Sequence, residues 1–200
     1  MKIGRSANKK QQMEERIYEA GMTLFQEKGV ENTTLQEICE LAGVSKGTIF
    51  NYFSSKEDIV AKFGQNQIKV LREYAEQLPA SMNTKEKIIA VLIEDIRGVK
   101  ESAFSAKAAL KGISEGGEKV YQLESKNRSD LASIYESILK AGQKEKSDLN
   151  TALVADLIVS TYFHVLNKHF YHNNQLDMLE TSIIDSVDVL FNGIKSHIIN

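Results

Sequence analysis

Residues 34–53 read TLQEICELAGVSKGTIFNYF, and the order of their side chains predicts two short helices joined by a turn. Thr34 and Glu37 form a capping box, in which a hydroxyl and a carboxylate satisfy the first free amides of a helix. The small residues AGV then allow a tight turn, and Ser45 is a suitable cap for a second helix over 46–52. A helix, a glycine-containing turn and a short second helix together form a helix-turn-helix unit.

The second helix is expected to expose side chains that suit the major groove of DNA. Lys46 can reach guanine acceptors or phosphate, Thr48 can contact a thymine methyl group, and Asn51 has the geometry to pair with adenine. Gly47 allows close approach of the backbone, while nearby hydroxyls and Lys56 suit phosphate oxygens. The residues predicted from these properties to contact DNA are Thr33, Thr34, Ser45, Lys46, Gly47, Thr48, Asn51, Tyr52 and Lys56.

Helical spacing extends in both directions from this unit. Apolar residues from Ile17 to Phe25 predict a first helix, and Gly29 is a typical helix end. Ser55 is the expected cap of a long helix that runs to about Gln77, shortly before the chain's only proline. Further helices are expected from the capping pair of Asn83 and Glu86 onward, and over 102–114, 118–141, 149–171 and 176–197. With nine expected helices and no strand, the predicted fold class is all-α.

The composition agrees with a helical globular protein and excludes several other classes. Among 200 residues there is one proline and one cysteine, with 42% hydrophobic and 26% charged residues. The lone Cys39 excludes an intramolecular disulfide and indicates a reducing compartment. The most apolar run, 152–166, is shorter than the roughly 20 residues that a membrane span needs. With no targeting segment apparent at the amino terminus, we expect a cytoplasmic protein without a membrane partner.

The net charge of −2 conceals an uneven distribution. Residues 1–12 carry Lys2, Arg5, Lys9 and Lys10 and no acidic residue. This basic amino-terminal arm can attract phosphate, although a solubilising terminus explains the same charges.

The order of residues around the predicted turn resembles the TetR family of bacterial transcriptional regulators. The pattern GVxxTTLxxI begins at Gly29, and AGVSKGTIFxYFxxKE begins at Ala42. The resemblance covers residues 13–63 and implies a three-helix DNA-binding domain over 13–56, followed by a helical effector-binding and dimerisation domain over 57–200. It also places Phe50 at a DNA-contact position, where the family commonly has a tyrosine whose hydroxyl is absent here.

The resemblance implies a homodimer formed by the last two helices. These helices carry more apolar residues than one bundle needs, although an intramolecular core would explain them as well. The residues expected at the dimer interface are Leu153, Leu157, Tyr162, Ile183, Val187, Leu190, Phe191 and Ile194.

A small-molecule effector site within 84–170 is also implied by the resemblance. No cluster of charged residues indicates the effector's class, so an apolar or aromatic compound is the expectation, and no cofactor is predicted. Candidate lining residues, each of which also suits an ordinary core, are Phe104, Leu110, Tyr121, Tyr135, Phe163 and His164.

Two patterns that suggest chemistry have simpler explanations. Gly112–Gly116 matches G-x-S-x-G, but the hydrolase motif requires a preceding strand, and here an alanine-rich helix precedes it. His169 and His172, with His164 nearby, lack the cysteine or carboxylate that a metal site would add. We therefore predict neither a catalytic nor a metal site.

These features predict a ligand-responsive regulator, most simply a repressor, that binds a pseudo-palindromic DNA operator as a dimer. A transcriptional activator or an architectural DNA binder would share the same helix-turn-helix. A helical small-molecule-binding protein or enzyme that only retains the amino-terminal fold is the alternative from another class; no catalytic set is apparent, so an enzyme is not expected.

Overall fold

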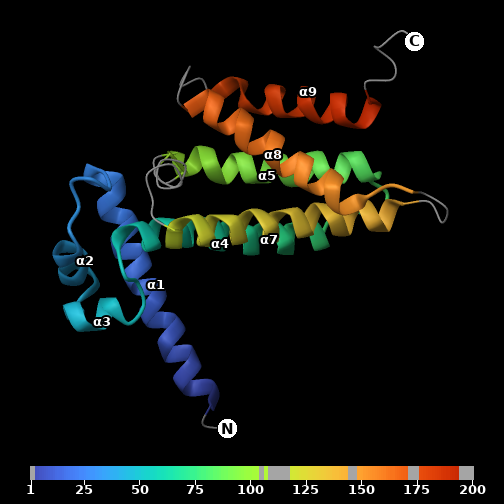
Figure 1. Ribbon diagram of the computed structural model, residues 1–200. Coiled ribbons are helices and arrows are strands. Elements are labelled where there is room, and N and C mark those ends of the chain that lie inside the picture. The colour runs from blue at the N-terminus through green and yellow to red at the C-terminus, as the bar shows by residue number, and fades with distance from the viewer. Residues whose placement is uncertain (1–2, 104–105, 108–117, 144–147, 171–175, 194–200) are drawn as a thin grey trace. The chain divides into compact units, whose positions relative to one another are not determined.

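The computed structural model describes residues 3–103, 106–107, 118–143, 148–170 and 176–193 (Figure 1). Within these ranges the regular structure consists of eight α-helices and one short 3-10 helix, and no strand occurs. The predicted all-α class is confirmed. The chain divides into two compact units, residues 1–65 with 102–124, and residues 66–101 with 125–200.

The first unit contains the predicted helix-turn-helix. It consists of α1 (Ile3–Lys28), α2 (Leu35–Ala42), α3 (Lys46–Phe50) and the beginning of α4 (Lys56–Glu76). Helix α1 packs against α2, and α2 against α3 (Figure 1). Fully buried side chains from all four helices form one core, whose largest members are Ile17, Phe25, Ile38, Ile49 and Ile59. The expected arm over residues 1–12 differs from the structure in one respect, because residues from Ile3 onward already belong to α1.

Helix ends in this unit follow the predicted capping chemistry. Thr34 and Glu37 form the complete capping box of α2, and Ser45 caps α3. The Asp58 amide donates to Ser55 Oγ at 3.2 Å at the start of α4. The turn after α2 depends on Gly43, whose φ of 62° is a left-handed conformation that side chains disfavour. Because these interactions join residues that are close in the sequence, the sequence predicts the helices of this unit.

The second unit is a bundle built around α5 (Thr84–Glu101), α8 (Thr151–Lys168) and α9 (Leu179–Asn192), with the later part of α4. Helix α7 (Glu118–Gly142) contributes its residues from 125 onward. Helix α9 packs against both α5 and α8 (Figure 1). The predicted Asn83–Glu86 capping pair opens α5, whereas a 3-10 turn over Leu176–Met178 precedes α9. Most of the predicted helix over 102–114 lies outside the described residues. Across the described part of the chain, no helix has the length and apolarity to cross a membrane.

Candidate functional site

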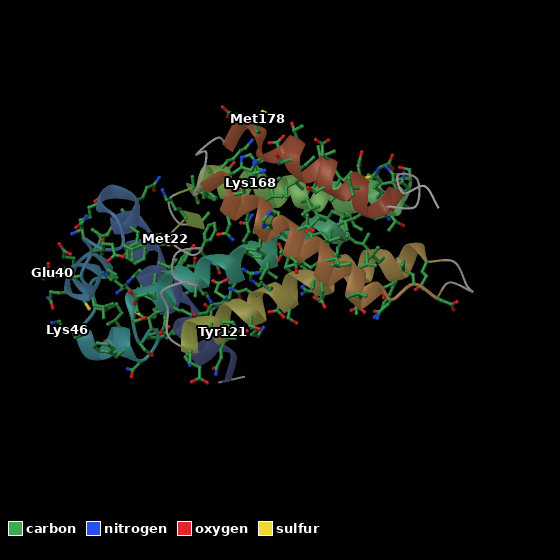
Figure 2. The ribbon with its side chains drawn as sticks, turned by 45° about the horizontal axis from the view of Figure 1, so that its top comes forward. Met22, Glu40, Lys46, Tyr121, Lys168 and Met178 are labelled. Carbon is green, nitrogen blue, oxygen red and sulfur yellow. The ribbon has the colours of Figure 1, made fainter. Side chains whose placement is uncertain are left out.

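Helix α3 presents an exposed face that is fixed from beneath by one buried side chain. Ile49 is fully buried in the core of the first unit, whereas Lys46, Gly47, Phe50 and Asn51 are exposed (Figure 2 labels Lys46). Phe50 leaves 54% of its surface exposed, which is unusual for a large apolar ring. The helix ends at Phe50, two residues before the predicted end, and Asn51 is its C-cap. A cation and a ring on the helix and the amide of Asn51 therefore lie on the exposed side.

The hydroxyls at the start of α3 are held by local hydrogen bonds. The Thr48 amide donates to Ser45 Oγ at 3.1 Å, and the Ser45 and Thr48 hydroxyls lie 2.8 Å apart. Tyr52 is half-buried against the same core. Ser45 thus fixes the orientation of Thr48, while both residues remain at the rim of the exposed face.

Two of the threonines predicted to bind phosphate also make local hydrogen bonds that hold the chain before α2. Thr33 is buried, and its hydroxyl donates to the Gly29 carbonyl at 2.7 Å. The Thr34 hydroxyl belongs to the capping box with Glu37, which also pairs with Lys28. The Lys28 ammonium, followed by the Thr34 amide and hydroxyl, lowers the pKa of Glu37 to about 2, so this carboxylate stays ionised. Thr34 itself remains exposed.

Lys56 makes hydrogen bonds that the sequence did not indicate. Its ammonium donates to the carbonyls of Val30 at 2.7 Å, Thr33 at 3.2 Å and Glu31 at 3.3 Å. One cation at the start of α4 therefore fastens the loop before α2. Lys56 therefore has a structural role in addition to the phosphate contact that the sequence predicts.

Arg16 is a cation near the turn that the sequence reasoning missed. It is exposed on α1, and its guanidinium donates to the Gly43 carbonyl at 3.3 Å. In the sequence, Arg16 directly precedes Ile17, which is buried, and therefore lies at the edge of the core-facing stripe of the first helix. This neighbourhood is the signal that could have identified it.

The candidate effector residues occupy different environments. Phe104 and Leu110 lie outside the described residues. Tyr121 leaves 64% of its surface exposed and His164 is exposed, whereas Tyr135 is fully buried. Phe163 is half-buried, and the guanidinium of Arg128 lies 3.9 Å above its ring. No single surface among the described residues brings these candidates together.

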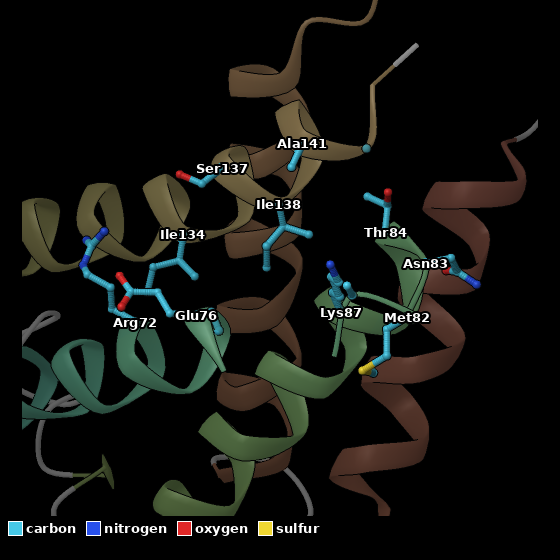
Figure 3. A pocket seen from close by; sticks show the side chains of 13 residues that line it. Arg72, Glu76, Met82, Asn83, Thr84, Lys87, Ile134, Ser137, Ile138 and Ala141 are labelled. Atoms are coloured by element: carbon cyan, nitrogen blue, oxygen red, sulfur yellow. The ribbon is translucent and has the colours of Figure 1, made fainter. Parts of the chain in front are cut away.

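A cavity of about 510 Å³ lies elsewhere in the second unit, between the end of α4, the start of α5 and the end of α7 (Figure 3). Ile134 and Ile138 form part of its apolar wall, and Arg72, Glu76 and Lys87 bring charge to it. Its volume lies in the range of ligand sites. None of the six predicted effector residues lines it.

The residues predicted at a dimer interface separate into two groups. Leu153 and Leu157 on α8 are 55% and 45% exposed, and Val189 on α9, which was not predicted, is 57% exposed. Tyr162, Ile183 and Val187 are already buried within the single chain, so they offer no surface to a partner. Leu190 and Phe191 are half-buried, and Ile194 lies outside the described residues.

The patterns that suggest chemistry gain no support from the described residues. Gly112–Gly116 and His172 lie outside them. His169 is buried, with its Nε2 3.1 Å from Ser182 Oγ, and Cys39 is buried in the core of the first unit. Where the chain is described, no three His, Cys, Asp or Glu side chains gather as metal ligands.

Comparison with known proteins points in one direction. Residues 17–63 match the model of bacterial regulatory proteins of the tetR family. The HTH-type transcriptional regulator SAS2464 of Staphylococcus aureus (strain MSSA476) is 23% identical over 87% of this chain and 94% of its own length. YerO of Bacillus subtilis (strain 168), described as an uncharacterized HTH-type transcriptional regulator, is 26% identical over 93% of this chain and 67% of its own.

Solved structures share the fold along nearly the whole chain. Thermus thermophilus FadR, a TetR-family repressor in complex with lauroyl-CoA, superposes with a TM-score of 0.78 at 21% identity, covering 94% of this chain and 96% of its own. Bacillus subtilis FadR in complex with stearoyl-CoA gives a TM-score of 0.69 at 21% identity, covering 88% and 96%. The arrangement of an amino-terminal helix-turn-helix and a carboxy-terminal helical domain is therefore confirmed.

Proposed function

This chain belongs to the TetR family of bacterial regulatory proteins, and we propose that it is a ligand-responsive repressor that binds a pseudo-palindromic operator as a homodimer. The observation that carries the proposal is the exposed face of α3, where Lys46, Phe50 and Asn51 surround the buried anchor Ile49. Since this role is performed on DNA and requires no catalysis, we place the protein in the cytoplasm and assign it no enzymatic activity.

In this proposal, direct readout comes from α3 and positioning comes from its surroundings. Asn51 pairs with adenine, Lys46 reaches guanine or phosphate, and Thr48 and Phe50 contact apolar edges such as the thymine methyl group. Gly47 lets the backbone approach the groove. The phosphate contacts come from Ser45, Thr34 and Tyr52, with Arg16 as a further cation beside the turn. Thr33 and Lys56 contribute mainly by holding the loop that carries Thr34.

Dimerisation is proposed through the exposed apolar residues of α8 and α9. Leu153, Leu157 and Val189 would otherwise remain in water, and burying them against a second copy is favourable. A two-fold dimer presents two copies of α3 to half-sites about one helical turn apart, or a multiple of it, which is why a pseudo-palindromic operator is expected.

The effector response is proposed as a shift between two populations of the dimer. A small molecule that binds one conformation more tightly favours that conformation by its difference in affinity. The FadR proteins similar to this chain were solved with acyl-CoA molecules, which supports a small-molecule response and leaves the compound for this chain open.

DNA binding is tested with labelled duplexes that tile the region upstream of the protein's own gene. We expect one duplex to bind with an affinity that falls steeply as salt increases, because lysine and arginine side chains displace counterions from phosphate. Asn51→Ala should weaken that duplex much more than random DNA. Asn192→Ala, an exposed asparagine on α9, is the matched control and should bind as the wild type does. Absent or salt-insensitive binding to every duplex would refute the proposal.

The repressor assignment has its own test in the cell. Transcripts from the genes beside the bound duplex should rise when the protein is deleted. If those transcripts fall instead, the protein is an activator with the same DNA-binding domain.

A further inference from the structure

Four helices of the second unit each contribute one polar side chain to a buried cluster. Asp95 comes from α5, Gln67 from α4, Tyr135 from α7 and Tyr162 from α8, and we refer to them as the Asp95 cluster. Asp95, Tyr135 and Tyr162 are 5%, 0% and 2% exposed. A carboxyl group and two phenols at this depth are unusual in a core that is otherwise apolar.

The cluster has unused hydrogen-bonding capacity. The Gln67 amide is a hydrogen-bond partner of the Asp95 carboxyl. The Tyr162 hydroxyl interacts with the carboxyl and favours its ionised form. Neither this hydroxyl nor that of Tyr135, however, makes a hydrogen bond of ordinary distance and angle with the described residues. Buried polar groups without partners cost free energy, so such groups normally have a protein, water or ligand partner.

The described residues provide no cation for Asp95. It forms no ion pair with any of them, and the Arg128 guanidinium lies over the ring of Phe163. Burial raises the pKa of Asp95 to about 7, so the carboxyl is held between its neutral and ionised forms near neutral pH. A cation placed beside it would remove the cost of burying this charge.

The sequence makes room for this cluster. Gly98 follows Asp95 by three residues and so lies on the same face of α5. A Cβ atom at Gly98 would overlap Gln67 Nε2, so any other residue would displace the amide from the carboxyl. Glycine inside a helix is less stable than alanine, yet here it lets Gln67 reach Asp95. The absence of a side chain at Gly98 therefore leaves the place that the Gln67 amide occupies beside Asp95.

We propose that the Asp95 cluster is the polar anchor for an effector that carries a protonated amine on an apolar body. The inference rests on the proposed effector response and names the chemical class of the compound. The carboxylate provides the opposite charge, and the two phenol oxygens accept the remaining N–H bonds of the ammonium group. An anionic head group would add a second negative charge beside Asp95 and is disfavoured. If water occupies the site instead of an effector, binding of added compounds should not depend on the charge of their head group.

Three probes with one alkyl chain and different head charges test the proposal. Octylamine, octanol and octanoate are titrated into the 200-residue protein by calorimetry at about pH 8, where both Asp95 and the amine are largely charged. We expect octylamine to bind about tenfold or more tightly than octanoate, with octanol between them. Asp95→Asn, of nearly the same shape, should abolish the preference for the amine and leave octanol binding unchanged. Asp156→Asn, an exposed acid on α8, is the matched control and should keep the preference.

Four results would overturn the inference: no binding of any probe, equal binding of all three, tighter binding of octanoate, or a preference that persists in Asp95→Asn. Circular dichroism establishes that the variants are folded. Operator binding is measured on the same preparations. If operator binding is intact while the amine preference is absent, only this inference fails; if operator binding is absent, the proposed function fails.

Discussion

The helix-turn-helix and the Asp95 cluster differ in whether their polar side chains have hydrogen-bond partners. Around α3, the hydroxyls of Thr33, Thr34 and Ser45 all have partners within a few residues. In the Asp95 cluster, two phenols have no regular partner and a carboxyl group has no cation among the described residues. The first region is complete by itself and presents a fixed surface, the one proposed to contact DNA. The second carries an uncompensated cost, which is typical of a site that binds something.

The largest expected effect concerns the stability cost of Asp95. Its pKa of about 7 in the folded protein exceeds the ordinary 3.8, so the folded state binds a proton more tightly than the unfolded state. Stability is then lost as pH rises from about 4 through about 7, by up to about 4 kcal/mol. Asp95→Asn should unfold at higher temperature than the wild type at pH 8 and at about the same temperature at pH 4. If Asp95→Asn and the wild type melted at the same temperature at both pH values, this cost would be absent. The control Asp156→Asn should leave the melting temperature unchanged at pH 4 and at pH 8.

The next effect distinguishes the buried and exposed sides of α3. Ile49→Ala removes a fully buried side chain and should destabilise the protein by about 2–4 kcal/mol in urea unfolding. Phe50→Ala removes a ring that is 54% exposed, so it should alter stability by less than about 1 kcal/mol while weakening operator binding. If Phe50→Ala destabilised the protein as much as Ile49→Ala, Phe50 would not lie on an exposed face of α3.

Base readout by Asn51 is expected to be worth about 1–3 kcal/mol. Asn51→Ala should relax the preference at one base pair of each half-site, measured with duplexes that vary that position. The same loss on every sequence would indicate a phosphate contact. Asn192→Ala should leave the profile unchanged.

The smallest effect decides the role of Lys56. Because its ammonium already donates to three carbonyls, Lys56→Ala should reduce stability by about 1 kcal/mol and flatten the salt dependence of DNA binding by less than about one. A change of a full unit with unchanged stability would assign Lys56 to a direct phosphate contact. The reference is Arg16→Ala, alone and combined with Lys56→Ala, because Arg16 donates to the Gly43 carbonyl and not to the loop before α2.

The same contrast explains what could be predicted from the sequence. The caps at Thr34, Ser45 and Asn83 join residues three apart, so their chemistry is visible in a short window. The Lys56 bonds span 23 to 26 residues, and the Asp95 cluster joins four helices, so no local pattern indicates either. The aromatic ring of Tyr135 predicts a ligand residue, whereas the structure relates its buried hydroxyl to Asp95 only electrostatically: burial, and then the nearby carboxylate, raise the pKa of this phenol. The sequence assigns Tyr162 to the dimer interface because periodicity marks a buried face without showing which partner covers it, and the structure buries Tyr162 within the single chain.

Operator recognition by α3 is tested most directly by footprinting the protein along the region upstream of its own gene. The account predicts two protected half-sites with centres about 10 base pairs, or a multiple of that spacing, apart. Protection should disappear in Asn51→Ala and remain in Asn192→Ala. Uniform protection of all sequences, or protection that Asn51→Ala leaves intact, would contradict the account.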